Sequence, residues 1–103
     1  MNPYIRLFRP EMVLIGIAFL FISSMIVPGS DPLNAHMIIG AVSVALFVMG
    51  GNALNDYADS ASDSVSHPSR PVPSGQIPRE NALYAGCSLL MASAIIAVLL
   101  PVV

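Results

Sequence analysis

The chain has 103 residues, of which 55% are hydrophobic and only 10% are charged, and its formal net charge is −2. Intrinsically disordered proteins combine low hydrophobicity with high net charge, and soluble domains carry about 25% charged residues, so neither class fits. A nucleic-acid-binding protein is excluded as well, because four arginines and no lysine cannot form the basic surface that neutralises phosphates. An all-α membrane protein remains.

Three stretches lack charged side chains, at residues 12–27, 35 to about 54 and 82–103, and they predict transmembrane helices at about residues 10–28, 35–55 and 82–103. A helix needs about 20 apolar residues to cross a hydrocarbon core of about 30 Å. The second and third stretches meet this length. The first is slightly short, and we expect Ile5, Leu7 and Phe8 to extend it.

Two alternatives compete with this prediction. The first stretch could be a secretory signal peptide, but it is long for that purpose, and it ends in PGSDP where a cleavage site needs small residues. The stretches could also form the core of a soluble helical protein, but three of them in so short a chain leave no polar faces for water. Membrane spans are therefore the preferred interpretation.

The arginines predict the orientation of the spans. Two lie before the first span and two lie between the second and third, namely Arg6, Arg9, Arg70 and Arg79. The short loop 28–34 has only Asp31, so the N-terminus and the polar loop 56–81 are predicted on the cytoplasmic side of the cell membrane. Because the third stretch ends without a basic or aromatic anchor, we expect residues 1–103 to be the N-terminal part of a longer domain.

The strongest chemical signal is the acidic segment NDYADSASD at residues 55–63. In a continuing helix, Asn55, Asp59 and Asp63 recur every four residues and share one face, with Asp56 beside them. Carboxylates one turn apart repel each other unless a cation lies between them. Since Mg²⁺ is typically held by one or two carboxylates plus substrate phosphates, the segment predicts a magnesium site. A solvated loop whose aspartates merely end the helix is the alternative.

A proline-rich segment follows the acidic one. Its prolines stand at positions 68, 71, 73 and 78, and they prevent a continuing helix. A backbone stiffened in this way could place Arg70 opposite the acidic face, where its planar guanidinium would bind a phosphate through two hydrogen bonds. A plain connector is the alternative. For His67 we favour solvation over catalysis, and for Cys87 we favour packing.

Together these segments resemble the motifs of a known family. Residues 55–63 resemble the NDxxDxxxD motif of the UbiA-type intramembrane prenyltransferases, and residues 70–75 (RPVPSG) resemble their RPxPSG element. Arg9 and Pro10 resemble the Arg-Pro pair that opens the family's first helix. Within the family, the pattern looks closest to archaeal geranylgeranylglyceryl-phosphate geranylgeranyltransferase and to chlorophyll synthase.

The resemblance implies a bundle of nine transmembrane helices, of which this chain would supply the first three. It implies the Mg²⁺-dependent transfer of a prenyl group from a prenyl diphosphate to a lipid or aromatic acceptor in the membrane. The surrounding membrane lipids are implied as further partners. The site residues that it implies are, for magnesium and catalysis, Asn55, Asp59 and Asp63, and, for the diphosphate, Arg70, Arg9 and Asp56.

The sequence also departs from the family pattern. No acidic residue follows Glu80, so the family's second acidic motif, DxxxD, is absent, and the basic residues common in the first motif are replaced by SAS at residues 60–62. We therefore expect these 103 residues to be inactive on their own. A small oligomeric transporter and a noncatalytic membrane fragment are the alternative functions. The transporter is disfavoured because the predicted spans contain no acidic or basic group away from their edges, where Glu11 lies.

Overall fold

The computed structural model describes residues 2–26 and 35–99, and these residues form helices and turns without any strand. The helices are α1 (Pro3–Phe8), α2 (Pro10–Ile26), α3 (Ala35–Ala58), α4 (Ser60–Ser66) and α5 (Arg79–Leu99). The predicted short outer loop with Asp31, and the last residues of the first and third predicted spans (27–28 and 100–103), lie outside the described residues.

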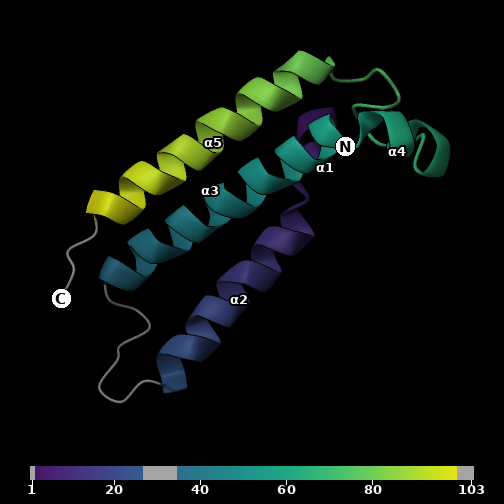
Figure 1. Ribbon diagram of the computed structural model, residues 1–103. Helices are drawn as coiled ribbons and strands as arrows, with labels where there is room; N and C mark the ends of the chain where they lie inside the picture. The colour runs from purple at the N-terminus through teal and green to yellow at the C-terminus, as the bar shows by residue number, and fades with distance from the viewer. Residues whose placement is uncertain (1, 27–34, 100–103) are drawn as a thin grey trace.

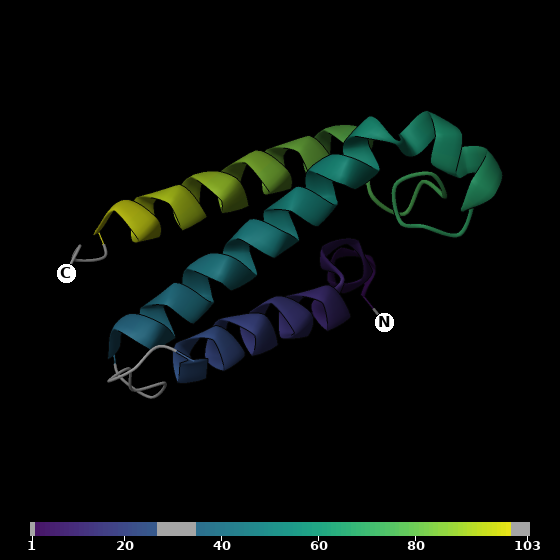
Figure 2. The same cartoon turned by 60° about the horizontal axis from the view of Figure 1, so that its bottom comes forward.

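The three long helices form one layer in which α3 lies between α2 and α5 (Figures 1 and 2). The short helices α1 and α4 and the loop at 67–78 gather at one end of this layer, where α3 ends and α5 begins (Figure 1). The polar segments singled out in the sequence therefore meet at a single end of the bundle.

Helices α3 and α5 are long and apolar enough to cross a membrane, whereas α2 is apolar but has only 17 residues. Only 22% of the most apolar window of α3 and 17% of that of α5 are buried, so neither resembles the core helix of a soluble protein. Large apolar side chains such as Phe19, Phe47 and Val98 are more than 60% exposed. A lipid environment explains this exposure, and a soluble core does not.

The predicted extension of the first span is wrong. Helix α1 is separated from α2 at Arg9, whose φ of 52° and ψ of 75° lie in the left-handed region. Pro10 causes the break, because proline restricts the residue before it, lacks an N–H group and favours the first position of a new helix. Leu7 is fully buried instead of extending the apolar surface of α2.

Helices α3 and α5 approach each other closely at two glycines. A Cβ atom on Gly50 would lie 3.0 Å from the backbone oxygen of Gly86, and a Cβ atom on Gly86 would lie 2.6 Å from Cγ of Leu54. Small residues allow such close contact between helices in membranes, where packing replaces the hydrophobic effect as the main source of association.

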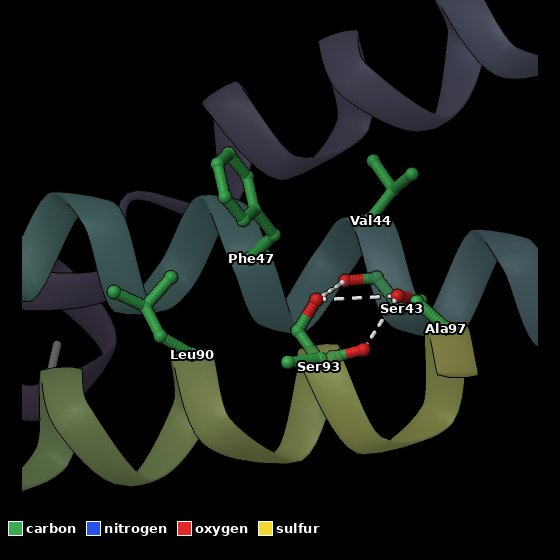
Figure 3. Close-up of a pocket in the computed structure, with 7 residues that line it drawn as sticks. Ser43, Val44, Phe47, Leu90, Ser93 and Ala97 are labelled. Carbon is green, nitrogen blue, oxygen red and sulfur yellow. Dashed lines mark hydrogen bonds between the residues drawn. The ribbon is translucent and has the colours of Figure 1, made fainter. Parts of the chain in front are cut away.

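Two serines join α3 and α5 farther from the polar end. Ser93 donates a hydrogen bond from Oγ to the backbone oxygen of Ser43 (2.8 Å), and Ser43 donates from Oγ to the backbone oxygen of Ser93 (3.1 Å). Figure 3 shows this pair at the base of an apolar groove that Phe47 and Leu90 also line. Since both hydroxyl groups are satisfied within the helix pair, the serines bind α3 to α5.

A small hydrophobic cluster lies beneath the proline-rich loop. Its buried members are Leu7, Ala53, Val72, Ile77 and Ala82. The loop folds over them through backbone hydrogen bonds from Ser74 to Arg70 (3.0 Å) and from Ile77 to Pro71 (3.0 Å). Gly75 adopts a φ of 83°, which glycine reaches without strain. The segment is therefore a packed turn.

Candidate functional site

The acidic segment bends at Asp59 but keeps its helical register. Helix α3 ends at Ala58 and α4 begins at Ser60. Backbone hydrogen bonds still reach four residues back through the bend, from Asp59 to Asn55 (2.8 Å) and from Asp63 to Asp59 (2.7 Å). The helix thus continues beyond the predicted span, as expected, and the four-residue spacing of the motif is preserved.

Burial divides the acidic segment into two pairs. Asp56 and Asp63 are 1% and 5% exposed, whereas Asn55 and Asp59 are exposed. Asp56 and Asp63 are seven residues apart, which brings them to the same side of a helix. That side faces α1 and the loop. A helical wheel cannot predict that these segments cover it, because it describes one helix alone.

Asp56 is paired with Arg9. Nη2 of Arg9 lies 2.5 Å from Oδ1 of Asp56, and the Asp56 side chain is only 2% exposed while that of Arg9 is 25% exposed. The backbone beside Arg9 is also held, because Asn52 donates a hydrogen bond from Nδ2 to the carbonyl oxygen of Phe8 (2.9 Å). An arginine from the start of the chain therefore neutralises an aspartate that α3 buries.

Asp63 is paired with Arg70 in the same way. Nη1 of Arg70 lies 3.0 Å from Oδ2 of Asp63, with side-chain exposures of 35% and 7%. Asp56 also interacts electrostatically with both Arg70 and Asp63. We call Arg9, Asp56, Asp63 and Arg70 the charge cluster. Arg70 therefore meets the predicted acidic face at Asp63 alone, because Asn55 and Asp59 are exposed while Asp63 is buried.

Sequence reasoning missed a second group of contacts around the charge cluster. Arg79 donates from Nε to the backbone oxygen of Tyr57 (3.1 Å), and its guanidinium carbon lies 4.1 Å from the centre of the Tyr57 ring. Arg6 donates from Nη2 to the backbone oxygen of Ser69 (2.6 Å). From the sequence, Arg6 and Arg79 entered only the prediction of membrane orientation. Their positions close to the motifs could have indicated that they contact the site. Arg79 thereby connects α5 to the acidic segment, and Arg6 connects α1 to the proline-rich loop.

An apolar groove of about 310 Å³ lies next to Arg9, between the start of the chain and α3. Its lining residues are Ile5, Phe8, Pro10, Val13, Leu14 and Met49. Phe8 and Pro10 flank Arg9 in the sequence, so this groove, which we call the Arg9 groove, lies next to the backbone of one arginine of the charge cluster. Together they present an anion-binding group beside a surface suited to hydrocarbon.

The residues present fit only part of a magnesium site. Within residues 2–26 and 35–99, no three His, Cys, Asp or Glu side chains are placed to hold a metal ion. The exposed side chains of Asn55 and Asp59, one turn apart, have no hydrogen-bond or ion-pair partner in that part of the chain. Two oxygen donors suit a Mg²⁺ ion that completes its octahedral shell with phosphate oxygens and water, whereas Asp63 is paired with Arg70.

Comparison with known proteins identifies a family match. The model of the UbiA prenyltransferase family matches residues 13–103. The family predicted from the acidic and RPVPSG segments is thereby confirmed. No solved structure matches the chain significantly.

Several curated relatives share the name digeranylgeranylglyceryl phosphate synthase. The relative from Methanosphaera stadtmanae is 38% identical over 96 residues, which are 93% of this chain and 34% of the relative. Those from Methanobrevibacter smithii and Methanothrix thermoacetophila are 31% and 37% identical, over 97% and 90% of this chain and 34% and 35% of the relatives. The chain thus spans about a third of the length of the curated relatives it matches.

Proposed function

We propose, since this chain belongs to the UbiA prenyltransferase family, that it binds a prenyl diphosphate and contributes to transfer of the prenyl group to a membrane lipid. The observation that carries the proposal is that the residues on either side of Arg9 line an apolar groove, while Arg9 itself belongs to the charge cluster. The charge cluster contains two arginines suited to diphosphate, and the Arg9 groove beside it is lined by apolar side chains suited to an isoprenoid tail. An amphiphilic ligand of this kind matches both surfaces at once.

The name shared by the relatives suggests the product. We infer a geranylgeranyl diphosphate donor and a geranylgeranylglyceryl phosphate acceptor, which together yield digeranylgeranylglyceryl phosphate. In this reaction the allylic C–O bond to the diphosphate breaks, and an ether bond forms between that carbon and the free glyceryl hydroxyl oxygen. The hydroxyl proton and inorganic diphosphate are released, so atoms and charge balance. The prenyl tail of the donor would lie in the Arg9 groove.

Each residue of the site has a proposed role. Arg9 and Arg70 would bind the diphosphate oxygens, which a guanidinium binds through paired hydrogen bonds. Asn55, Asp59 and Asp63 would hold Mg²⁺, with Asp56 beside them. The bound ion would neutralise negative charge on the departing diphosphate. The buried cluster under the loop would limit the access of water to this end of the bundle.

The proposal extends to the architecture. We propose that α2, α3 and α5 are the first three spans of a nine-helix bundle and that the 17 residues of α2 cross the membrane, since they extend about 26 Å. The hydrogen bond from Arg6 to Ser69 supports placing the N-terminus and the loop on the same side. The four arginines on that side favour the cytoplasm.

The alternative of a transporter gains no support. Within the described residues, the Asp, Glu, His and Arg side chains of α2, α3 and α5 occur only near helix ends, as with Glu11, His36 and Arg79. A transported ion or polar solute would need such groups near the middle of the membrane.

The test is binding of geranylgeranyl diphosphate to the 103-residue chain in lipid nanodiscs, measured by calorimetry with and without Mg²⁺. We expect binding to require Mg²⁺ and to weaken at least tenfold in Asp59→Ala and Asp63→Ala, because each loses a ligand of the ion. Glu80→Ala, which removes an exposed acid outside the charge cluster, is the matched control and should bind like the wild type. Binding without Mg²⁺, or unaffected by either substitution, would refute the metal assignment.

A further inference from the structure

We infer that Asn52 is a positioning residue, which holds Arg9 where its guanidinium meets both Asp56 and the diphosphate. This inference rests on the proposed function and adds a residue that lies outside the acidic and RPVPSG segments. The supporting geometry is a pair of adjacent contacts. Asn52 binds the carbonyl oxygen of Phe8, and Asp56, one helical turn later, binds the side chain of Arg9.

Arg9 needs this support because its backbone is unfavourable. A φ of 52° places a residue with a side chain in the left-handed region, which such residues avoid. Pro10 further limits the conformations of the residue before it. A strained backbone persists only where surrounding contacts determine it. The Asn52 hydrogen bond is such a contact, because it fixes the peptide group that joins Phe8 to Arg9.

The carbonyl of Phe8 also lacks the usual helical partner. In a continuous helix it would accept from the N–H of Met12, but that N–H donates to the oxygen of Arg9 (3.0 Å). The side-chain amide of Asn52 takes this place at 2.9 Å, and Asn52 is only 8% exposed. Without it, the partly buried carbonyl of Phe8 would lose this donor, and the junction of α1 and α2 would rearrange.

The inference has a direct consequence for binding. A junction that can rearrange allows Arg9 to leave its position beside Asp56. Asn52 itself lies beneath the junction and need not touch the ligand. Replacing Asn52 would therefore change the diphosphate affinity only when Arg9 is present. This dependence on Arg9 distinguishes a positioning residue from one that only stabilises the fold.

The experiment is a double-mutant cycle between Asn52→Ala and Arg9→Gln in nanodiscs, with inorganic diphosphate and Mg²⁺ as the probe. We expect Asn52→Ala to weaken diphosphate binding by about threefold to tenfold, as for one lost hydrogen bond. In the Arg9→Gln background, Asn52→Ala should have no further effect. Asn52→Gln keeps the amide and should recover part of the affinity. Ser43→Ala removes a buried hydrogen bond elsewhere on α3 and serves as the fold control.

The outcomes separate the inference from the proposed function. If the wild type binds no diphosphate, the proposed function fails. If it binds and Asn52→Ala has no effect, or if the two substitutions weaken binding additively, only the positioning role is refuted. Should Arg9→Gln not fold, Arg9→Lys replaces it in the cycle, because lysine keeps the charge beside Asp56 while losing the planar fork.

Discussion

The close approach of α3 and α5 makes a sharp prediction at two consecutive glycines. Gly50 faces α5, and an added Cβ would meet the oxygen of Gly86 and the N and Cγ of Leu90, each at 3.0 Å. Gly51 follows it in the same helix, and an added Cβ would have no atom within 4 Å. Alanine at either position makes the same chemical change, so the two variants differ only in packing.

The magnitude follows from two opposing terms. Alanine in place of glycine favours a helix by about 0.8 to 1 kcal/mol, and this term is shared by both variants. Overpacking costs about 1 to 3 kcal/mol, and it applies only to Gly50→Ala. Two of the three atoms crowded by that Cβ belong to the backbone, so no side-chain rotation relieves them. We expect Gly50→Ala to be less stable than Gly51→Ala by about 1 to 3 kcal/mol.

The assay is reversible unfolding of each variant by SDS in mixed micelles, followed by far-ultraviolet circular dichroism. Gly51→Ala should be at least as stable as the wild type, and Gly50→Ala should fall below Gly51→Ala. If the free energies of unfolding of the two variants agree within about 0.3 kcal/mol, smaller than either term above, the helices do not meet at Gly50 and the reasoning is refuted.

Three further predictions concern the charge cluster. Arg9→Gln should destabilise the chain by about 3 kcal/mol, the low end for a broken buried ion pair since the Arg9 side chain is 25% exposed, and by more than Asp56→Asn does, because it leaves the buried carboxylate without its cation; equal losses in SDS unfolding would contradict this. In the absence of diphosphate, Arg70→Gln should raise the affinity for Mn²⁺ about tenfold, since the substitution frees Asp63 from its ion pair. Electron paramagnetic resonance would measure this affinity, and an unchanged value would argue against Asp63 as a metal ligand. In the wild type, diphosphate should strengthen Mn²⁺ binding. Removing the metal with EDTA should weaken diphosphate binding by the same factor, because coupling between two ligands is reciprocal. If calorimetry finds that the two ligands bind independently, a shared site is excluded.

Local features of the sequence predicted much of the fold. Absence of charge over about 20 residues marked α3 and α5, because crossing hydrocarbon depends on length and composition alone. The spacing of Asn55, Asp59 and Asp63 survives in the structure, since backbone hydrogen bonds four residues apart continue through the bend. The prolines correctly marked the end of the helical segment, because proline has no N–H group.

The same local reasoning failed at the start of the chain. Counting apolar residues joined Ile5, Leu7 and Phe8 to the first span, although Pro10 was visible and favours a new helix at its own position. Hydropathy treats each residue as a contribution to a sum. It therefore cannot detect a change of chain direction at a single residue.

The sequence by itself determined which residues could enter a membrane and which could bind an anion or a metal, because these properties belong to individual side chains and their spacing. The tertiary structure alone decided which aspartates are buried and which arginine each one meets. Arg9 reaches Asp56 across 47 positions of sequence, and Asn52 reaches Phe8 across 44. Such pairings depend on how α1 and the loop pack against α3, and packing is a property of the assembled chain.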